Sequence, residues 1–360
     1  MHIAHLKLRN FRNYARLDVD FKPGLTLFIG NNAQGKTNIL EAIYLLATLK
    51  SFRGATTSEM IRYSQNGFFI SANIVSDVNH EIKIYCSHPE RRISLNNHTV
   101  RRVSEIFGVV KAVVFSSEDR FLIQGSAKQR RRYLDYILAN TESGYLDILQ
   151  NYSKALKARN VILKQSSIDF GLLESFTSQV VQLGNKLIKY RQELVKNISP
   201  VIEESYRKIS EGADNISIEY KPSVKKNFAL ELANCREREL ALQTTIIGPH
   251  RDDVAIYIND KLAISFASEG QVRTIAIAMK IAQAEYISAK VGVPPILLVD
   301  DIMGELDKNR RVAFLPLLER SNYLRSQVFL TCTEQTWPGE LINQIEAWNV
   351  SAGTIEKLKK

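Results

Sequence analysis

The chain is poor in cysteine and proline. Its 360 residues include 3 Cys and 9 Pro, and the cysteines Cys86, Cys235 and Cys332 lie far apart. An odd number of scattered cysteines forms neither a disulfide framework nor a C-x-x-C zinc pattern. The sequence therefore predicts a protein of a reducing, cytoplasmic environment.

Long hydrophobic runs are also missing. The apolar stretches at residues 42–49 and 293–299 are far shorter than the roughly 20 residues that a membrane helix needs. Charged residues interrupt the first 18 positions every few residues, so they contain no apolar segment of the kind found in a secretory signal. The sequence predicts neither a membrane segment nor a partner in a membrane.

Basic residues outnumber acidic ones. The chain has 48 Lys and Arg against 38 Asp and Glu, a formal net charge of +10, and residues 128–208 alone contain 14 basic and 8 acidic residues. A basic surface of this size suits a polyanion such as nucleic acid. A soluble protein that simply has a high pI has the same composition, so charge alone leaves both interpretations open.

The periodicity of apolar residues predicts an α/β fold that a helical segment interrupts. Alternating or continuous apolar runs predict strands before residue 120 and after residue 212. Between them, Leu173 begins a heptad pattern that continues to Leu194, and an earlier apolar stripe runs from Tyr145 to Leu163. The expected strands are residues 17–21, 25–29, 69–75, 82–86, 93–95, 99–100, 109–115, 216–220, 254–258, 262–266, 296–299 and 328–330.

The two helical stripes predict an antiparallel helical hairpin. Such a hairpin would project on the order of 40–60 Å at 1.5 Å per residue. The alternative is an ordinary helical subdomain that does not protrude. Pro200 is expected to kink or end the second helix, because proline lacks the backbone N–H.

A phosphate-binding loop follows the strand at residues 25–29. The segment fits G-x-x-x-x-G-K-[ST] at every position, and an apolar-faced helix follows it. In such a loop the glycines let backbone amides wrap phosphate oxygens, Lys36 neutralises phosphate charge, and the Thr37 hydroxyl ligates Mg²⁺. The predicted loop residues, together with the next one, are Gly30, Asn31, Asn32, Ala33, Gln34, Gly35, Lys36, Thr37 and Asn38.

A P-loop also needs an acidic partner at the end of another buried strand. Four apolar residues at 296–299 precede Asp300 and Asp301. We expect Asp300 to hold Mg²⁺ and Asp301 to orient or deprotonate the attacking water. A polar strand end without a catalytic role is the alternative for this pair.

The long separation of the two motifs indicates the class of ATPase. Asp300 lies 263 residues beyond Thr37, whereas compact P-loop kinases and G proteins place these elements much closer together. A helical insert between the two halves is typical of ABC and SMC ATPases, in which two heads enclose the nucleotide. We therefore expect a split ATPase head at residues 1–120 and 245–360, with an inserted helical arm at residues 121–244.

ABC heads need a serine-containing loop at a helix start, which contacts the nucleotide of a partner head. Ser268, Gly270 and Gln271 precede a strong helix and fit this role. Ser268 with Gln271 three positions later is also a capping box, and the two roles are compatible. The segment from Gly304 to Asp307 could communicate across such a dimer.

At this point the motifs resemble the RecF family, a bacterial branch of the SMC-type ATPases. The resemblance covers nearly the whole chain and rests on the P-loop and on short segments around it. Where the family usually has proline, Ser117 and Ala127 stand here, and Gly304 replaces its usual Ser or Ala, which adds flexibility to the predicted communication loop. The segments that carry the resemblance are residues 10–14, 32–38, 50–53, 118–119, 125–126, 130–135 and 248–253.

The resemblance implies more than the spacing does. It implies that Arg12 and Asn13 lie by the nucleotide, and that Asp301, in place of the Glu of most ABC proteins, supports slow, DNA-stimulated ATP hydrolysis. It implies ATP and Mg²⁺ as cofactors, an ATP-dependent homodimer, and binding to duplex, gapped or junction DNA and to single strands. It further implies work with RecO and RecR in loading RecA at gaps during recombinational repair and replication restart, and a link to the SOS response.

Two basic clusters are candidate DNA contacts. A run of three arginines opens a predicted helix, and four more flank the predicted hairpin near residues 96–98; a solvated surface is the alternative for both. His250 beside Asp252 and Asp253 could suggest a second metal site, but a single His makes a turn the preferred interpretation. The candidate arginines are Arg130, Arg131, Arg132, Arg91, Arg92, Arg101 and Arg102.

Three functions fit the sequence to different degrees. The preferred one is an ATP-switched DNA clamp, in which Ser268 of one head faces Lys36 of the other. The second is a scaffold with a static nucleotide that recruits repair proteins without switching. A transporter ATPase subunit is the third, and the motif pattern disfavours it because the predicted arm does not resemble the helical subdomain of such proteins.

Overall fold

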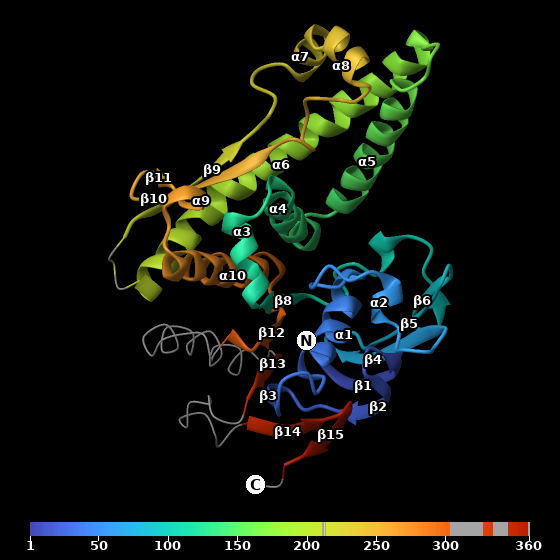
Figure 1. Ribbon diagram of the computed structural model, residues 1–360, viewed down its shortest axis with the longest axis vertical. Coiled ribbons are helices and arrows are strands. Elements are labelled where there is room, and N and C mark those ends of the chain that lie inside the picture. The colour runs from blue at the N-terminus through green and yellow to red at the C-terminus, as the bar shows by residue number, and fades with distance from the viewer. Residues whose placement is uncertain (211, 213, 303–326, 334–344, 359–360) are drawn as a thin grey trace. The chain divides into compact units, whose positions relative to one another are not determined.

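The computed structural model describes residues 1–210, 212, 214–302, 327–333 and 345–358. The chain divides into two compact units (Figure 1). Unit 1 comprises Met1–Asp119, Lys208–Glu211 and Ile277–Lys360, and unit 2 comprises Arg120–Arg207 and Gly212–Ala276. Residues 245–276, which the sequence analysis assigned to the ATPase head, group with the helical unit.

Unit 1 contains a largely parallel six-stranded sheet with the strand order β15-β14-β3-β13-β12-β8. Strands β14, β3, β13, β12 and β8 run parallel, and β15 pairs antiparallel with β14. Strands buried on both faces have nearly continuous apolar sequences, and residues 296–299 fit this pattern. The strands are β3 (Gly24–Ile29), β8 (Ala112–Phe115), β12 (Ile296–Asp300), β13 (Gln327–Cys332), β14 (Ile345–Ser351) and β15 (Thr354–Lys357).

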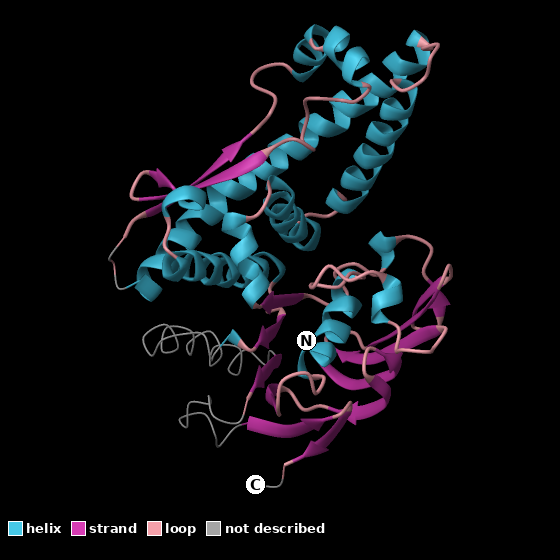
Figure 2. Cartoon of the chain, viewed as in Figure 1, coloured by secondary structure: helices cyan, strands magenta, loops and turns pink. Residues whose placement is uncertain are grey.

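A second six-stranded sheet of unit 1 is antiparallel, with the order β2-β1-β4-β5-β6-β7 (Figure 2). One face contributes Leu8, Ile70 and Ile84 to a core shared with helix α1 (Lys36–Thr48). Asn96 and Asn97 both have positive φ, 51° and 64°, which two-residue hairpin turns require. The strands are β1 (His2–Phe11), β2 (Tyr14–Asp20), β4 (Gly67–Val75), β5 (His80–Ser87), β6 (Arg91–Leu95) and β7 (His98–Thr99).

The predicted helical hairpin is present in unit 2, formed by α5 (Tyr145–Ile162) and α6 (Phe170–Ser210). Tyr145 contacts Tyr190 with 5.5 Å between ring centroids, and Arg159 reaches Thr177 nearer the connecting turn. The two helices are therefore antiparallel. Within the unit they form an arm that carries α7 and α8 at its far end (Figure 1). The prediction that Pro200 could end the second helix is wrong, because α6 continues through it to Ser210.

A three-stranded antiparallel sheet with the order β11-β10-β9 completes unit 2. The expected strand at residues 262–266 is wrong beyond Leu262, since the chain turns into the short helix α9 (Ala263–Phe266). The strands are β9 (Ile216–Lys221), β10 (Asp253–Ile258) and β11 (Lys261–Leu262). The remaining helices within the described ranges are α2 (Thr57–Met60), α3 (Phe121–Gln124), α4 (Ala127–Thr141), α7 (Phe228–Asn234), α8 (Arg236–Leu242) and α10 (Glu269–Val291), with 3₁₀ turns at Val103–Glu105 and Ser117–Arg120.

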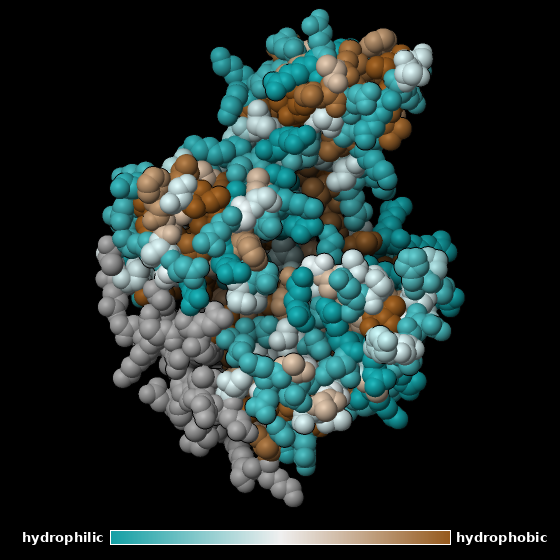
Figure 3. Space-filling view, in the orientation of Figure 1, coloured by the Kyte–Doolittle hydropathy of each residue, from teal (hydrophilic) through white to brown (hydrophobic). Residues whose placement is uncertain are grey.

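Hydrophobic surface is distributed unevenly over the described residues (Figure 3). None of the described helices is long and apolar enough to cross a membrane. Exposed apolar side chains of unit 2 occur at the end of the arm, a kind of surface that often marks a contact site. Those at the end of the arm are Val161, Phe170, Leu172, Leu230 and Leu242, and three more, Leu262, Ile264 and Phe266, lie at β11 and α9.

Candidate nucleotide site

The two predicted halves of the nucleotide site meet at one edge of the parallel sheet. Strand β13 pairs with β3 on one side and with β12 on the other, so the carboxyl ends of all three strands lie together. The Thr37 hydroxyl donates a hydrogen bond of 2.7 Å to Oδ1 of Asp300. Residues 263 positions apart in sequence therefore belong to one site, as the motif spacing required.

The P-loop conformation depends on its two glycines. Gly30 has a φ of 155° and Gly35 a φ of 118°, in the range that favours glycine. A Cβ on Gly30 would lie 2.3 Å from the backbone oxygen of Val350, and one on Gly35 would lie 2.6 Å from the Asn13 side chain. Both glycines are therefore needed for close packing around the loop as well as for its backbone shape.

Lys36 folds back across the loop that it terminates. Its Nζ donates to the backbone oxygens of Gly30 at 2.6 Å and Asn31 at 2.9 Å, and the residue is buried. The ammonium group is thus held at the mouth of the loop by two neutral carbonyls. A phosphate at this position would add the negative partner that the carbonyls do not supply.

Segments from both ends of the chain support the loop from behind. Asn13 donates from Nδ2 to the Gln34 oxygen at 2.8 Å and accepts from Nδ2 of Asn38 at 2.8 Å. From the turn between β14 and β15, Ala352 N donates to Gln34 Oε1 at 2.7 Å and Gly353 N donates to the Gln34 backbone oxygen at 3.1 Å. Sequence reasoning missed this turn, because a loop contact across more than 300 residues leaves no local pattern.

Arg12 has a supporting position. Its Nε and Nη2 each donate to the Glu41 carboxylate at 2.7 Å, and its Nη1 donates to the Glu59 backbone oxygen at 2.7 Å. Glu41 is fully buried on α1 and also accepts from the Ser51 hydroxyl. Arg12 therefore anchors the helix that follows the P-loop, and the resemblance-based prediction that it contacts nucleotide is not tested by this geometry.

The acidic pair lies beside a threonine of β13. Thr331 donates from its hydroxyl to Asp300 Oδ1 at 3.0 Å and accepts from the Asp301 backbone N–H at 2.9 Å. Burial raises the pKa of Asp300, while hydrogen bonds from Thr37 and Thr331 oppose the shift. Burial also raises the pKa of Asp301, and the charge of Lys36 lowers it. A cation at this edge would stabilise both carboxylates.

Arg53 is a further candidate that the sequence analysis did not assign to the site. Its Nη1 lies 3.4 Å from Asn38 Oδ1, and its charge lowers the pKa of Asp300 against the effect of burial. The side chain is exposed, so it is available to an anionic ligand. The sequence signal that could have pointed to Arg53 is its position shortly after the helix that follows the P-loop.

The residues present fit a magnesium ion bound together with a nucleotide. Among the described residues, no group of three or more His, Cys, Asp or Glu side chains forms a metal site. Mg²⁺ usually takes one or two protein oxygens and completes its shell with water and phosphate oxygens. Thr37 and Asp300 supply that number of ligands, so the site suits Mg²⁺ only when phosphate is also bound.

The expected signature segment is a capping box at the start of α10. Ser268 N donates to Gln271 Oε1 at 2.8 Å, and Gln271 N donates to the Ser268 Oγ at 3.3 Å. Gln271 Nε2 also donates to Asp214 Oδ2 at 2.9 Å. Ser268 is exposed while Gln271 is held in place, which leaves the serine accessible. The predicted communication segment at residues 304–307 lies outside the described residues.

Comparisons with known proteins agree with this arrangement. The sequence profile of the RecF/RecN/SMC N-terminal domain family matches residues 2–352. The DNA replication and repair protein RecF of Streptococcus uberis is 37% identical over 99% of this chain and 100% of the relative. The RecF of Symbiobacterium thermophilum is 34% identical over 99% of this chain and 98% of the relative.

The chain belongs to the RecF family. A solved structure described as the recombination mediator protein RecF with ATP in the RecFOR pathway matches with a TM-score of 0.91 and 30% identity, over 99% of this chain and 98% of that one. An Smc head domain from Pyrococcus furiosus matches with a TM-score of 0.59 and 17% identity, over 99% and 96%. The predicted ABC/SMC-type ATPase head fold is confirmed.

The arginine run that this RecF-family chain carries on α4 is mostly engaged within unit 2. Arg130 is buried and pairs with both carboxylate oxygens of Asp253, at 2.7 and 2.9 Å. Arg131 donates to the Asp252 backbone oxygen at 2.6 Å. Because Arg130 is buried and paired, its placement does not support the predicted DNA contact. Arg132 is the one arginine of the three that is exposed.

The arginines around the β6–β7 hairpin also differ from one another. Arg91 donates to the Leu49 backbone oxygen at 3.0 Å, and Arg92 pairs with Glu90 at 2.6 Å. Arg101 and Arg102 are exposed and precede a 3₁₀ turn. All four side chains are exposed overall, so contact with DNA stays a prediction for them.

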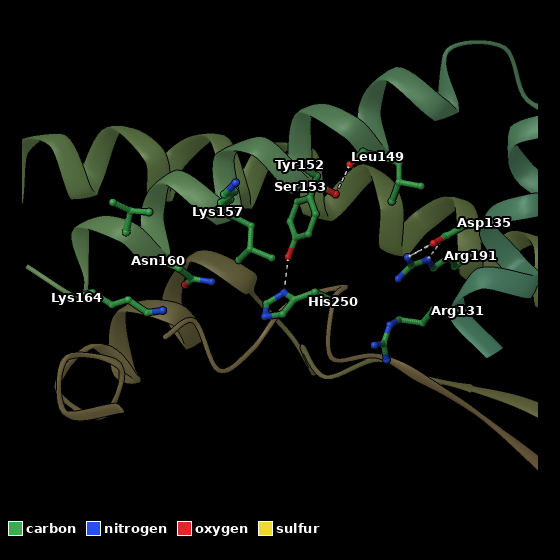
Figure 4. Close-up of a pocket in the computed structure, with 12 residues that line it drawn as sticks. Arg131, Asp135, Leu149, Tyr152, Ser153, Lys157, Asn160, Lys164, Arg191 and His250 are labelled. Carbon is green, nitrogen blue, oxygen red and sulfur yellow. Dashed lines mark hydrogen bonds and ion pairs between the residues drawn. The ribbon is translucent and has the colours of Figure 1, made fainter. Parts of the chain in front are cut away.

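His250 lies in a groove of about 520 Å³ beside α5 (Figure 4). Its Nδ1 is 2.7 Å from the Tyr152 hydroxyl, and its Nε2 is 3.1 Å from the Thr245 backbone oxygen. Burial lowers the pKa of His250 to about 4, so the ring is neutral near pH 7. These contacts support the interpretation as a turn over that as a second metal site.

Proposed function

We propose that the protein binds ATP with Mg²⁺ and uses it to control binding to DNA. The contact between Thr37 and Asp300, at 2.7 Å, is the observation that carries this proposal. It joins Thr37 of the phosphate-binding loop to Asp300, so two oxygen ligands suited to a magnesium ion lie side by side. The relative described with ATP, which is 30% identical over 99% of this chain, supports the same ligand.

Each side chain has a role that follows from its position. Lys36 and the loop amides bind the phosphates, and Thr37 and Asp300 hold the metal, which neutralises phosphate charge when bound. Asp301 lies next to Asp300 with its backbone fixed by Thr331. Its half-buried carboxylate, shorter than the glutamate of most ABC proteins, orients the attacking water, so ATP hydrolysis is slow and resets the switch.

Dimerisation follows from the signature segment. Ser268 is exposed at the N-terminus of α10, where the helix dipole favours an anion. In the proposed ATP-bound homodimer it faces the nucleotide held by Lys36 of a second copy. The net charge of +10 suits the closed dimer to duplex, gapped or junction DNA.

The biological setting follows from the family. Relatives are described as DNA replication and repair proteins and as acting in the RecFOR pathway. We infer that this protein acts in the cytoplasm with RecR and RecO at single-strand gaps, where it promotes RecA loading during recombinational repair, replication restart and the SOS response.

The substitution Lys36→Ala tests the proposal. It removes the charge that the phosphates need, so we expect ATP affinity to fall roughly 100-fold, on the scale of a charge-assisted hydrogen bond. ATP-dependent dimerisation and duplex binding should be lost with it. Isothermal titration, light scattering and fluorescence anisotropy measure the three effects, and Lys22→Ala is the control because Lys22 is an exposed lysine of the same unit.

A second measurement, the affinity for RecR with ATP, with ADP and without nucleotide, separates the switch from a static scaffold. A scaffold that merely contains a nucleotide would bind RecR equally well with ATP, with ADP and without nucleotide. A switch would bind one state more tightly. Dimerisation and DNA binding by Lys36→Ala at wild-type levels with ATP would contradict the proposed switch.

A further inference from the structure

The outer face of the antiparallel sheet in unit 1 has a composition that the nucleotide site does not explain. One face of this sheet is packed against the core, as Leu8, Ile70 and Ile84 show. The opposite face carries charged, polar and aromatic side chains in alternation with them. Neither Phe69 nor Tyr85 on this outer face belongs to the core cluster.

The strand register places aromatic and basic residues in one row. Arg9 of β1 pairs with Phe69 of β4, which pairs with Tyr85 of β5. The row continues on both sides, since Arg9 pairs with Arg16 of β2 and Tyr85 pairs with Arg92 of β6. Two neighbouring aromatic rings are thus flanked by arginines on three other strands.

These side chains are accessible. Tyr85 is 39% exposed, Phe69 is partly exposed, and Arg9, Arg16 and Arg92 are exposed. A hollow of about 410 Å³ opens on this face beside Phe69. It is lined by Arg9, Lys7, Lys83, His5, Ser71, Asn73, Glu81 and Phe69.

The charges of the row are not all neutralised locally. Within the row, Arg92 pairs with Glu90 and Arg16 lies 3.9 Å from Asp18. Of the neighbouring lysines, Lys7 pairs with Asp18 at 3.0 Å and Lys83 pairs with Glu81 at 2.7 Å. Arg9 forms no ion pair with any residue that the structure describes. The cation next to Phe69 is therefore available to an external anion.

A third aromatic ring lies in the loop between α2 and β4, which is hydrogen-bonded to the C-terminal end of β1. The Arg62 backbone N–H donates to the Asn10 oxygen at 2.8 Å, and Asn10 Nδ2 donates to Gln65 Oε1 at 3.1 Å. Tyr63, within this loop, is 93% exposed. The loop thus adds an exposed ring at the end of the sheet where Arg9 lies.

We propose that this row, formed by Arg9, Phe69 and Tyr85 with Arg16 and Arg92 at its ends, binds single-stranded nucleic acid by stacking bases on the two rings. Aromatic side chains on adjacent strands of a sheet stack successive bases, and arginines beside them contact the phosphates. An acidic protein surface would use the arginines but not the rings. The presence of both favours a nucleic acid strand.

The inference deepens the proposed DNA-binding function by naming a site for the single strand. It differs from that function because it needs neither nucleotide nor a dimer. All its residues lie in unit 1, on a different sheet from the P-loop. The ring pair could instead only stabilise the sheet, as cross-strand aromatic pairs do, and the experiment must distinguish these roles.

Two oligonucleotides with equal phosphates test the stacking. The full chain is titrated, without nucleotide, with fluorescent dT16 and with an abasic strand of the same length, and anisotropy gives both affinities. We expect dT16 to bind roughly tenfold or more tightly than the abasic strand, since stacking on an aromatic side chain is worth a large factor per base. Equal affinities for the two strands in the wild type would overturn the proposal.

Phe69→Thr and Tyr85→Thr remove the rings and keep a residue that favours strands. We expect each substitution to lower the affinity for dT16 roughly fivefold to hundredfold and to leave the affinity for the abasic strand unchanged. Tyr85→Phe should retain the preference. The matched control is Tyr257→Thr on β10 of unit 2, where the same ring is lost from another sheet. A change in thermal stability without a change in the preference would assign the rings to the sheet alone.

Arg9→Gln should weaken both strands equally and lower the salt dependence by about one phosphate contact. Competition by polyglutamate as effective as that by dT16, unaffected by the Thr variants, would indicate an acidic protein partner and overturn the proposal. Lys36→Ala separates the two claims, because it should abolish ATP-dependent duplex binding and leave the preference for dT16 intact. Failure of either result therefore contradicts one claim without the other.

Discussion

The buried charges at the nucleotide site of unit 1 and those in the arm of unit 2 differ in whether the chain supplies their partners. In unit 2, Arg159 and Glu239 are 1% and 0% exposed and pair at 2.6 Å. In unit 1, burial raises the pKa values of Asp300 and Asp301, and no described residue forms a salt bridge with Asp300. Charges that are satisfied within the chain stabilise a structure, whereas charges that are not satisfied mark a place for a ligand.

The Arg159 network extends this contrast. Arg159 also donates to the hydroxyls of Thr177 at 2.9 Å and Thr245 at 2.7 Å. The second oxygen of Glu239 accepts from the Ile246 N–H at 3.0 Å. This set joins α5, α6, α8 and the segment before β10, so it holds the arm together without any external partner.

The largest effect is expected from breaking this satisfied pair. Glu239→Gln leaves a buried guanidinium without its counter-charge and should lower the free energy of unfolding of unit 2 by about 3–5 kcal/mol. Urea denaturation measures the loss, and ATP affinity should not change. Arg238→Gln, an exposed neighbour on the same helix, is the control and should stay within about 0.5 kcal/mol. Equal effects of the two substitutions would contradict the comparison.

A second prediction concerns pH and His250. Its pKa is about 4 in the folded protein, against an ordinary value of 6.5, because burial disfavours the charged ring. The unfolded chain therefore binds the proton more readily, and unit 2 should lose stability as the pH falls from 6.5 towards 4. The full loss is about 3 kcal/mol at about 1.4 kcal/mol per pKa unit.

His250→Gln removes this titration and can still bond with Tyr152 and with the Thr245 oxygen. Its free energy of unfolding should change less between pH 7 and pH 4 than that of the wild type. Equal pH dependence of the two proteins would show that other groups cause the acid sensitivity. Denaturant titrations at several pH values make the measurement.

The third prediction tests the unsatisfied side of the comparison. Asp300→Asn removes a buried charge and keeps the shape of the side chain. Without nucleotide the variant should be more stable than the wild type at neutral pH by on the order of 1 kcal/mol, the scale of desolvating a polar group. Below the ordinary Asp pKa of 3.8 the gain should vanish, because the wild-type carboxyl is then protonated in both states.

Added Mg²⁺ and ATP should reverse this order. The wild type gains stability by binding the ligand, whereas the variant has lost a metal ligand and gains less. Thermal unfolding with and without Mg²⁺ and ATP makes the comparison. An Asn variant less stable than the wild type under all conditions would show that Asp300 is a structural acid like Glu239.

Much of the nucleotide site was predictable because its parts have local patterns. The P-loop, the strand before it and the apolar run that ends in Asp300 are each readable over a few residues. Strand order then brings the ends together, since parallel strands share an edge. The support of Gln34 by Ala352 and Gly353 was not predictable, because no local pattern connects such distant segments.

Other errors have physical causes as well. Three consecutive arginines look alike in sequence, yet Arg130 shares the buried face of α4 with Leu134 and Ile137, which helical periodicity could have indicated. The alternation at residues 262–266 suited a strand, but Ile264 and Phe266 are exposed on α9. A short segment with no sheet neighbour to cover it has little reason to stay extended.

The smallest effect on stability is expected at Ser268, where the structural role and the proposed partner contact can be separated. Ser268→Ala removes the oxygen that caps α10 and should lower stability by about 1 kcal/mol. Ser268→Asp caps a helix as well as serine does, so stability should stay within about 0.5 kcal/mol.

The aspartate nevertheless places a negative charge where the phosphate bound by a second copy is proposed to lie. ATP-dependent dimerisation, measured by light scattering, should therefore be lost in Ser268→Asp and only weakened in Ser268→Ala. Dimerisation that instead follows stability across the two variants would reduce Ser268 to a helix cap.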